Sequence, residues 1–214
     1  MRKNTFMSMA LVAAIALLGT VLTSCGSSSS ASGSSIVEEA ISAAEESIPL
    51  EETPMFGTLP SLLKQRLEAG TIVGKQFREL KTEDMDEAAK NKSKRDEAEK
   101  ELEEYFTQKL EEAAKAVDGK AIKVDFDASQ FSAASATLKL GDAKRGYFNI
   151  VFDATLTKPV NEEVEFVWQF QDAQGNPLEN NSDYFVPGDK FTKEYIVIAY
   201  KDWAPQFERL YIKF

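Results

Sequence analysis

The chain has 214 residues with 35 acidic and 25 basic side chains, and its formal net charge is −10 at pH 7. It contains no histidine, and Cys25 is its single cysteine. Without histidine there is no Ser-His-Asp or Cys-His nucleophile pair, no His-ligated metal and no usual neutral-pH base. One cysteine forms no internal disulfide, and an acidic chain lacks the basic surface that nucleic acid requires. We therefore expect a non-enzymatic protein without catalytic residues, metal or cofactor, and with no nucleic-acid partner.

The first 25 residues follow the order of features of a secretory signal. Arg2 and Lys3 form a short basic segment, residues 6–22 form an apolar run, and two small residues follow. This order of basic, apolar and small residues is typical of a signal peptide. The apolar run ends abruptly at the serine-rich residues 26–34, so it is too short for a comfortable membrane span.

The segment Leu22-Thr23-Ser24-Cys25 closes the apolar run. It resembles the bacterial lipobox, in which an aliphatic residue and two small residues precede a cysteine that becomes lipidated. The resemblance implies a signal peptide over residues 1–24, cleavage by signal peptidase II after Ser24, and a diacylglycerol thioether and N-linked acyl chain (palmitate) on Cys25. Two or three acyl chains hold a protein on a membrane effectively permanently. The alternatives are an ordinary signal peptide with an incidental cysteine, or an uncleaved anchor.

The residues after Cys25 bear on the location of the protein. Gly26 stands where many lipoproteins of the inner membrane have Asp, which favours the outer membrane if the cell is Gram-negative. The next positions are serine, not the acidic cluster that sends lipoproteins of some lineages to the outer surface. We therefore expect the periplasmic face. Residues 25–34 are predicted to be a flexible serine-rich linker.

Residues 35–119 are predicted to be a helical region. Residues 35–118 hold 21 acidic and 12 basic side chains, whereas residues 119–214 hold 14 and 11, so the two halves differ in composition. Ser35-Ile36-Val37-Glu38 fits a capping box at the start of a first helix. A second helix shows leucines at helical spacing from Leu59 to Leu67, with Thr58 as its cap and Gly70 as its stop.

A much longer helix is predicted over residues 83–118, ended by Gly119. Its second half has an apolar stripe, which consists of Ala98, Leu102, Phe106, Leu110, Ala113 and Val117. Its first half is polar on every side, so the helix either breaks near residues 91–93 or projects into solvent. It is either an ordinary charged helix or a coiled-coil and protein-binding surface.

From Lys120 onward the apolar residues alternate as in strands. The predicted strands cover residues 122–126, 136–140, 148–156, 164–170, 184–186, 191–200 and 207–214, with turn signals between them. Seven short alternating strands predict an antiparallel β-sandwich over residues 120–214. The fold class is therefore α+β by segregation, with a helical region followed by the sandwich.

Residues 147–214 resemble the immunoglobulin-like domains of secreted bacterial proteins of unknown function. The resemblance rests on a strand ending in Asp172, a Gly175-Asn176-Pro177-Leu178 turn, and Pro187-Gly188-Asp189 leading into the next strand. It implies an immunoglobulin-like sandwich and brings no catalytic residues.

Aromatic residues are the candidate ligand-binding residues. Trp168 lies between Phe166 and Phe170 on the apolar face of its strand, which favours a core position. Trp203 lies in a loop between the last two strands, where it either stacks on a sugar, anchors a partner or folds back to cap the sandwich. Tyr184 and Phe185 alternate within a strand, so one of them is expected to be exposed. Trp203, Tyr184 and Phe185 are the candidate ligand-binding residues, any one of which would serve as the binding platform.

The carboxylates give weaker signals. Asp125 and Asp127 share one strand face, and residues 172–183 contain further oxygen ligands, but calcium needs six to eight converging oxygens and no EF-hand spacing is present. Glu162, Glu163 and Glu165 resemble a glycosidase pair only superficially, since nothing predicts an apolar pocket that would raise the pKa of one of them. We expect these carboxylates to be solvated.

These observations predict a lipid-anchored cell-envelope protein that acts as a binding or scaffolding module. Its partners would be the membrane, through Cys25, and a protein or glycan. One alternative is a carbohydrate- or peptide-binding lipoprotein of an uptake system, and a less favoured one is a histidine-free hydrolase. A further alternative makes the long helix the working surface.

Overall fold

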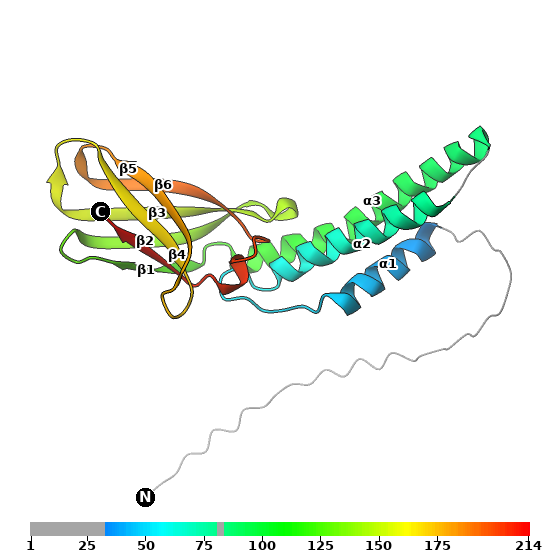
Figure 1. Cartoon of the computed structure of the whole chain (residues 1–214), viewed down its shortest axis with the longest axis horizontal. Coiled ribbons are helices and arrows are strands. Elements are labelled where there is room, and N and C mark those ends of the chain that lie inside the picture. The colour runs from blue at the N-terminus through cyan, green and yellow to red at the C-terminus, as the bar shows by residue number, and fades with distance from the viewer. Residues whose placement is uncertain (1–32, 81–83) are drawn as a thin grey trace, which may run out of the picture. The chain divides into compact units, whose positions relative to one another are not determined.

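Three helices precede seven strands in a computed structural model that describes residues 33–80 and 84–214 (Figure 1). The signal peptide, the lipidation of Cys25 and most of the linker are predictions on residues outside this part of the chain. The helices and strands are α1 (Gly33–Ser47), α2 (Leu59–Glu79), α3 (Met85–Val117), β1 (Ala121–Phe126), β2 (Phe131–Asp142), β3 (Tyr147–Val160), β4 (Val164–Gln171), β5 (Pro177–Phe185), β6 (Gly188–Ile198) and β7 (Arg209–Lys213). Two short 3₁₀ turns are η1 (Ala143–Arg145) and η2 (Ala204–Gln206).

The first two helices begin and end differently from the prediction. Helix α1 starts at Gly33, so Ser35 lies inside the first turn and not at the N-cap. Helix α2 continues through Gly70 to Glu79, because Ala69, Val73 and Phe77 extend its buried stripe. A glycine inside a helix lowers stability by about 1 kcal/mol relative to alanine, so this tertiary burial decides where α2 ends.

Helix α3 is continuous over 33 residues and does not break at residues 91–93. Asp84 caps its start, where a side-chain oxygen accepts a bond of 3.1 Å from the backbone N–H of Asp86. Its buried side chains begin only at Ala98, and its stripe uses Ala114, with Ala113 half-buried. The first three turns of α3 therefore remain helical with no buried residue, and they lie beside the end of α2, where Asn91 and Arg95 line a hollow with Phe77.

The seven strands form a single mixed sheet in the order β5-β4-β7-β1-β2-β3-β6. The prediction of a wholly antiparallel arrangement is wrong at one pair, because β1 runs parallel to β7. Strand β1 pairs with β2 at Ala121 and Ile122, and then with β7 from Lys123 to Phe126. The sheet therefore divides at β1 into two halves, β6-β3-β2 and β7-β4-β5.

The inner faces of the two halves pack against each other and nearly close a barrel (Figure 1). Phe166 of β4 lies 5.7 Å from Phe191 of β6 between ring centroids, and Trp168 of β4 lies 4.2 Å from Tyr195 of β6. Phe152 of β3 completes this layer, 5.4 Å from Phe191. Within the described residues β5 and β6 form the two edges of the sheet and do not pair with each other.

Strand β5 is much longer than the predicted residues 184–186. It begins at Pro177 and includes the polar run from Glu179 to Asp183, which has no apolar alternation. Pairing with β4 over its whole length makes this run a strand. Polar residues are tolerated there because β5 is an edge strand.

The helices and the sheet share one hydrophobic core. Phe56, in the loop before α2, lies 5.6 Å from Phe148 of β3 and 6.2 Å from Phe207 between ring centroids. The β2–β3 connection, which includes η1, reaches back over the helices (Figure 1). This junction positions the site described next.

Candidate functional site

A groove of about 690 Å³ lies where α2 meets the β2–β3 connection and the end of β6. Its walls come from one face of α2, from η1 and from two tyrosines of the sheet. The residues that line it are Leu63, Lys64, Arg66, Leu67, Gly70, Thr71, Lys144, Arg145, Tyr147 and Tyr200. We call it the α2–η1 groove.

Gly146 allows the two walls of the groove to meet at its floor. Its φ is +64°, in the left-handed region that favours glycine. A Cβ at this position would lie 2.5 Å from Cδ1 of Leu63 and 3.6 Å from Cδ1 of Tyr200. The close approach of the β2–β3 connection to α2 therefore requires a residue without a side chain.

Ion pairs hold the basic rim of the groove in place. Arg66 lies 2.6 Å from Glu103 of α3, measured between side-chain nitrogen and oxygen, and its other terminal nitrogen donates to the carbonyl of Lys144 at 2.7 Å. Lys144 reaches the same Glu103 at 3.7 Å, and Arg145 pairs with Asp142 at 3.6 Å. The two walls are thereby linked through Glu103.

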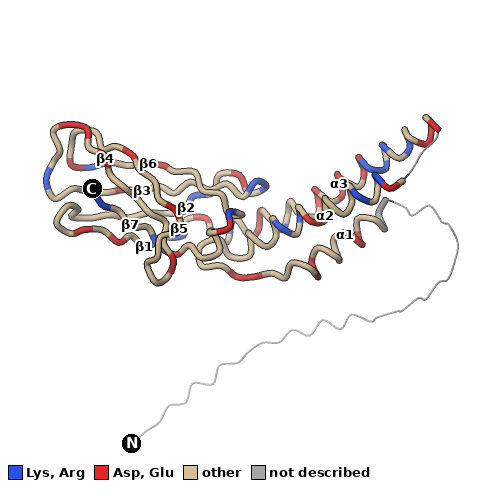
Figure 2. Tube along the Cα trace, in the orientation of Figure 1, with Lys and Arg blue, Asp and Glu red and all other residues tan. Residues whose placement is uncertain are grey.

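The rim carries more positive than negative charge. Four cations line the groove, whereas Glu103 and Asp142 are the acidic partners named above. Lys64 is exposed and makes no ion pair with any described residue. Helix α2 holds four basic and two acidic side chains, while α1 holds four acidic and no basic ones. Figure 2 shows basic residues at the β2–β3 connection, within a chain whose net charge is −10.

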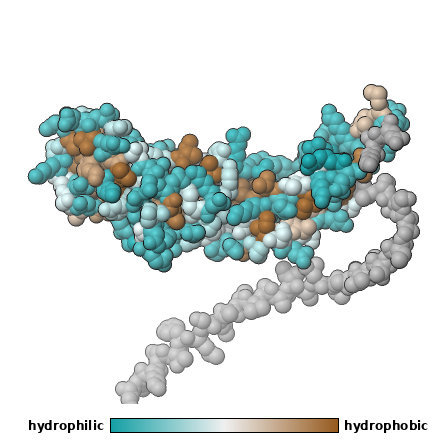
Figure 3. All heavy atoms as spheres, in the orientation of Figure 1, coloured by the Kyte–Doolittle hydropathy of each residue, from teal (hydrophilic) through white to brown (hydrophobic). Residues whose placement is uncertain are grey.

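The groove has an apolar lining that water reaches. Leu67 is 74% exposed and Tyr200 is 46% exposed. Tyr147 pairs with Ile198 across β3 and β6, and Ile196, two residues along the edge strand, is 74% exposed. The visible face of the molecule is mostly hydrophilic with separate hydrophobic patches over the sheet and the helices (Figure 3). The apolar lining therefore continues from α2 onto the outer face of β6.

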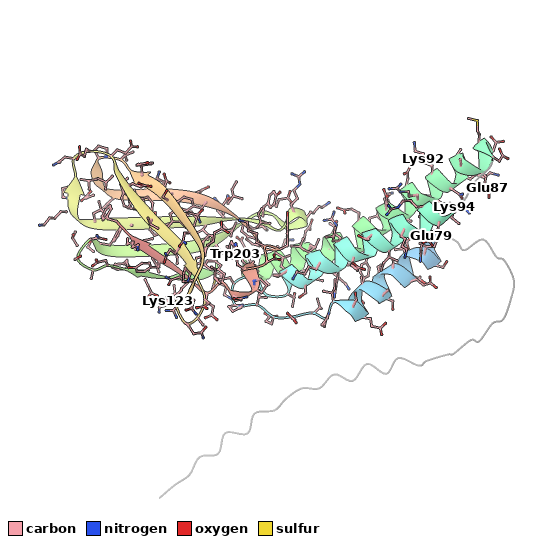
Figure 4. The ribbon with its side chains drawn as sticks, in the orientation of Figure 1. Glu79, Glu87, Lys92, Lys94, Lys123 and Trp203 are labelled. Carbon is pink, nitrogen blue, oxygen red and sulfur yellow. The ribbon has the colours of Figure 1, made fainter. Side chains whose placement is uncertain are left out.

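Trp203 folds back onto the sheet. Its ring lies 4.7 Å from Phe170 and 5.8 Å from Phe207, and its indole N–H donates to Glu179. Lys201 also pairs with Glu179, at 3.0 Å. Trp203 lies at the end of the sheet that faces the helices (Figure 4). Of the alternatives for this residue, the capping position is the one observed, with the ring half-buried.

The predicted platform of Trp203, Tyr184 and Phe185 is not brought together. Phe185 is 1% exposed and stacks on Phe166 at 4.1 Å, so it is a core residue and offers no binding surface. Tyr184 is 48% exposed and pairs with Glu165 on β4, whereas the Glu179 that holds Trp203 pairs with Phe170. These positions are five residues apart along β4, or about 17 Å at 3.4 Å per residue. The three candidate side chains therefore do not form one surface, and Trp203 and Tyr184 stay separate candidates.

The candidate carboxylates serve local structure. Asp125 pairs with Arg209 at 3.2 Å. The hydroxyl and backbone N–H of Ser129 hold the pKa of Asp127 below its usual range. The side-chain amide and backbone N–H groups of Asn176 and neighbouring turn residues do the same for Asp172. Within residues 33–80 and 84–214 there is no group of three or more acidic or cysteine side chains positioned to hold a metal ion.

Sequence patterns do not predict the α2–η1 groove, because its lining comes from segments more than 70 residues apart. Leu67 belongs to the leucine spacing that predicts an amphipathic helix, yet it faces solvent. One signal was available, namely the excess of basic residues in α2 next to two acidic helices. The Lys144-Arg145 pair inside a glycine-bounded turn was a second.

None of the described helices is both long and apolar enough to cross a membrane. Neither the family-model search nor the search of curated proteins finds a match to this chain. Among solved structures, the crystal structure of Campylobacter jejuni cj0090 is similar at 13% sequence identity, over 42% of this chain and 96% of that one. Its TM-score of 0.26 is too low for the likeness to bear on fold or function.

Proposed function

We propose that this chain is a lipid-anchored cell-envelope protein that acts as a binding module, with the α2–η1 groove as its binding surface. The observation that carries the proposal is the groove itself, in which exposed apolar side chains lie inside a rim of cations on an acidic chain. Exposed apolar surface rimmed by polar groups is typical of interaction sites. Tyrosine and arginine are also enriched among the residues that contribute most to binding.

The anchor is proposed from the lipobox resemblance at residues 22–25, and the location from Gly26 and the serines that follow. Cys25→Ser removes the thiol that would carry the acyl chains, so the variant should lose all labelling by a palmitate analogue and keep its signal peptide. Labelling and the apparent mass of the protein on a gel measure both effects. No label in the parent protein would contradict the anchor and leave the proposal for the groove unaffected.

We also propose that the sheet is a variant of the immunoglobulin-like sandwich. In support, its first strand pairs with β2 in one half and runs parallel to the last strand in the other. Its strand order departs from the constant-type arrangement, where strands ABED face CFG. In this protein β2 pairs with β3 in one half of the sheet, and β4 pairs with β5 as a hairpin in the other half. An experimental structure with a different pairing of β2 would overturn this assignment.

Charge reversal on the rim tests the binding surface. Arg145→Glu should reduce cross-linking of the intact-cell partner at least tenfold, because Arg145 is 72% exposed and lines the groove. Lys158→Glu is the matched control, since Lys158 is exposed and lies eleven residues along the chain from the Tyr147 that lines the groove. Equal capture by both variants would place the binding surface elsewhere.

The long helix remains an alternative working surface, and the structure changes how it must be tested. Deleting residues 83–118 would remove buried core residues such as Phe106 and Leu110, so loss of binding would reflect unfolding. Lys92 and Lys94 lie instead in the N-terminal part of α3, which has no buried residue (Figure 4). Replacing both with Glu leaves the core intact, and loss of capture in this variant alone would favour α3.

A further inference from the structure

We infer that the α2–η1 groove takes an acidic, amphipathic helix of a partner protein. This inference rests on the proposed function, because it assigns a ligand class to the same groove. It is carried by three features of the groove: the spacing of residues along α2, the sign of the charge on the rim, and the extension of apolar surface beyond the groove.

The exposed face of α2 has the spacing that a second helix needs. Leu67, Gly70, Thr71 and Gly74 follow one another at intervals of three, one and three residues, which places them on one face of the helix, and the buried Leu63 lies one turn before them at the groove floor. The small residues matter here, since a Cβ on Gly74 would meet no atom within 4 Å. Helices pack 8–10 Å apart depending on the side chains at the contact, so this face admits a close neighbour. An amphipathic helix in a groove of this kind is anchored at positions with matching spacing.

The rim selects the charge of that helix. Lys64 and Arg66 lie on the α2 side, and Lys144 and Arg145 on the η1 side. A helix lying between them with apolar residues inward would place its flanking side chains beside these cations. Acidic flanks meet complementary charge, while basic flanks meet repulsion, which disfavours wrong partners. A second copy of this chain docking by its own groove about a two-fold axis would oppose cation to cation.

The extent of the apolar surface indicates that the ligand of the groove is a protein and not a lipid or a sugar. Small-molecule sites bury most of their ligand, whereas Leu67 is 74% exposed at the groove and Ile196 is 74% exposed beyond it. A single acyl chain in this groove would remain in contact with water along its length. A neutral sugar would bring no charge to complement the excess positive charge of the rim, where Lys64 makes no ion pair with any described residue. A helix and its neighbouring residues would cover both the groove and the outer face of β6.

The test places a photo-activated cross-linker, p-benzoylphenylalanine, at Leu67 of the full-length protein in its own cells. The same probe at Lys158 gives the background. We expect a cross-link to a protein, with the attached peptide mapping by mass spectrometry to a helical segment whose apolar face is flanked by Asp and Glu. Lys64→Glu should reduce the cross-link at least tenfold, and it should leave the fold intact because Lys64 is exposed and unpaired among the described residues.

Reversal of charge on both partners completes the test. Replacing the acidic flanks of the mapped segment with Lys should restore at least half of the cross-link to the Lys64→Glu protein. A cross-link to phospholipid, glycan or a basic segment would overturn the inference and leave the proposed binding function standing. No cross-link above the Lys158 background would overturn both.

Discussion

The helical region and the sheet fill their interiors with different side chains. The three helices bury many alanines, at positions 40, 44, 69, 98 and 114, together with leucines. The sheet buries phenylalanines at positions 131, 148, 152, 166 and 185, with Trp168 among them. Helices pack with their axes 8–10 Å apart, and the shorter distances need small contact residues, whereas sheet faces stay about 10 Å apart. The difference follows from geometry, because large rings are needed to span the space between two sheet halves.

This contrast explains why the exposed groove lies on a helix. Each half of the sheet is covered on its inner face by the other half, so its apolar side chains meet a partner. Helix α2 contacts α1, α3 and the β2–β3 connection, yet Leu67 and Gly70 still face solvent. The helical region therefore leaves apolar side chains uncovered at its packing surface, whereas the exposed apolar residues of the sheet, such as Ile196, lie on its outer face. Uncovered apolar surface of this kind commonly serves interaction.

The largest effect is expected from removing an aromatic ring inside the sheet. Phe185→Ala should lower the free energy of unfolding by about 3–5 kcal/mol, as ring deletions in cores do. Phe185 is 1% exposed and contacts the rings of Phe166 and Phe191 at 4.1 and 4.0 Å between centroids. Urea unfolding followed by tryptophan fluorescence measures the loss.

Tyr184→Ala is the matched control for that experiment. Tyr184 is the preceding residue of the same strand, but it is 48% exposed on the opposite face. Its replacement should change the free energy of unfolding by no more than about 0.5 kcal/mol, the usual range for surface positions. A larger loss in Tyr184→Ala than in Phe185→Ala would mean that β5 is shifted by one residue, which would exchange its two faces.

A smaller effect is expected at the glycine that joins the two regions. Gly146→Ala combines a φ of +64° with a Cβ only 2.5 Å from Leu63, and should cost about 1–3 kcal/mol. Gly119→Ala isolates the backbone part, since its φ is +77° and a Cβ would meet nothing within 4 Å. The first variant should therefore lose more stability than the second in urea unfolding. The opposite order would show that the groove floor has room that the structure does not indicate.

The sequence predicted the elements whose burial is periodic. Seven strands and the apolar stripe of α3 follow from alternation and from helical spacing, and Gly119, with a φ of +77°, marks the end of α3 as predicted. The polar part of β5 was missed because pairing with β4, not periodicity, makes it a strand. The parallel pairing of β1 with β7 was missed because residue patterns carry no information on strand direction.

Candidate binding residues were harder to predict than elements. The Tyr184–Phe185 pair was correctly expected to have one exposed member, because neighbouring strand residues face opposite ways. The register of β5 with β4 decides which of the two residues is exposed, and the sequence does not give that register. The α2–η1 groove brings Leu67 beside Tyr200, and only the tertiary structure defines that proximity. Site prediction therefore fails where its residues come from distant segments.

The smallest effect is expected from a polar cluster that ties α1 to α3. Glu45 accepts hydrogen bonds from Tyr105 at 2.7 Å and from Lys109 at 2.9 Å. Its bonds to Lys109 and then to Tyr105 lower the pKa of Glu45. Burial opposes the charge on Lys109, but its bonds to Tyr105 and Glu45 outweigh burial and raise the pKa of Lys109. Both charged side chains are about two-fifths exposed, so solvent screening limits the pair to roughly 0.2–1 kcal/mol.

The signs of these shifts fix the pH dependence. A lowered carboxyl pKa gives stability that is present above the ordinary pKa of 4.5 and is lost as the pH falls through the folded-state pKa. A raised lysine pKa gives stability that is present below 10.5 and is lost as the pH rises through the folded-state pKa. The parent protein should exceed Glu45→Gln in stability between these limits, and the difference should vanish in acid. Urea unfolding at a series of decreasing pH values measures it, with the exposed Glu46→Gln as control. A difference that does not decrease as the pH falls would mean that packing of α1, not charge, holds it on α3.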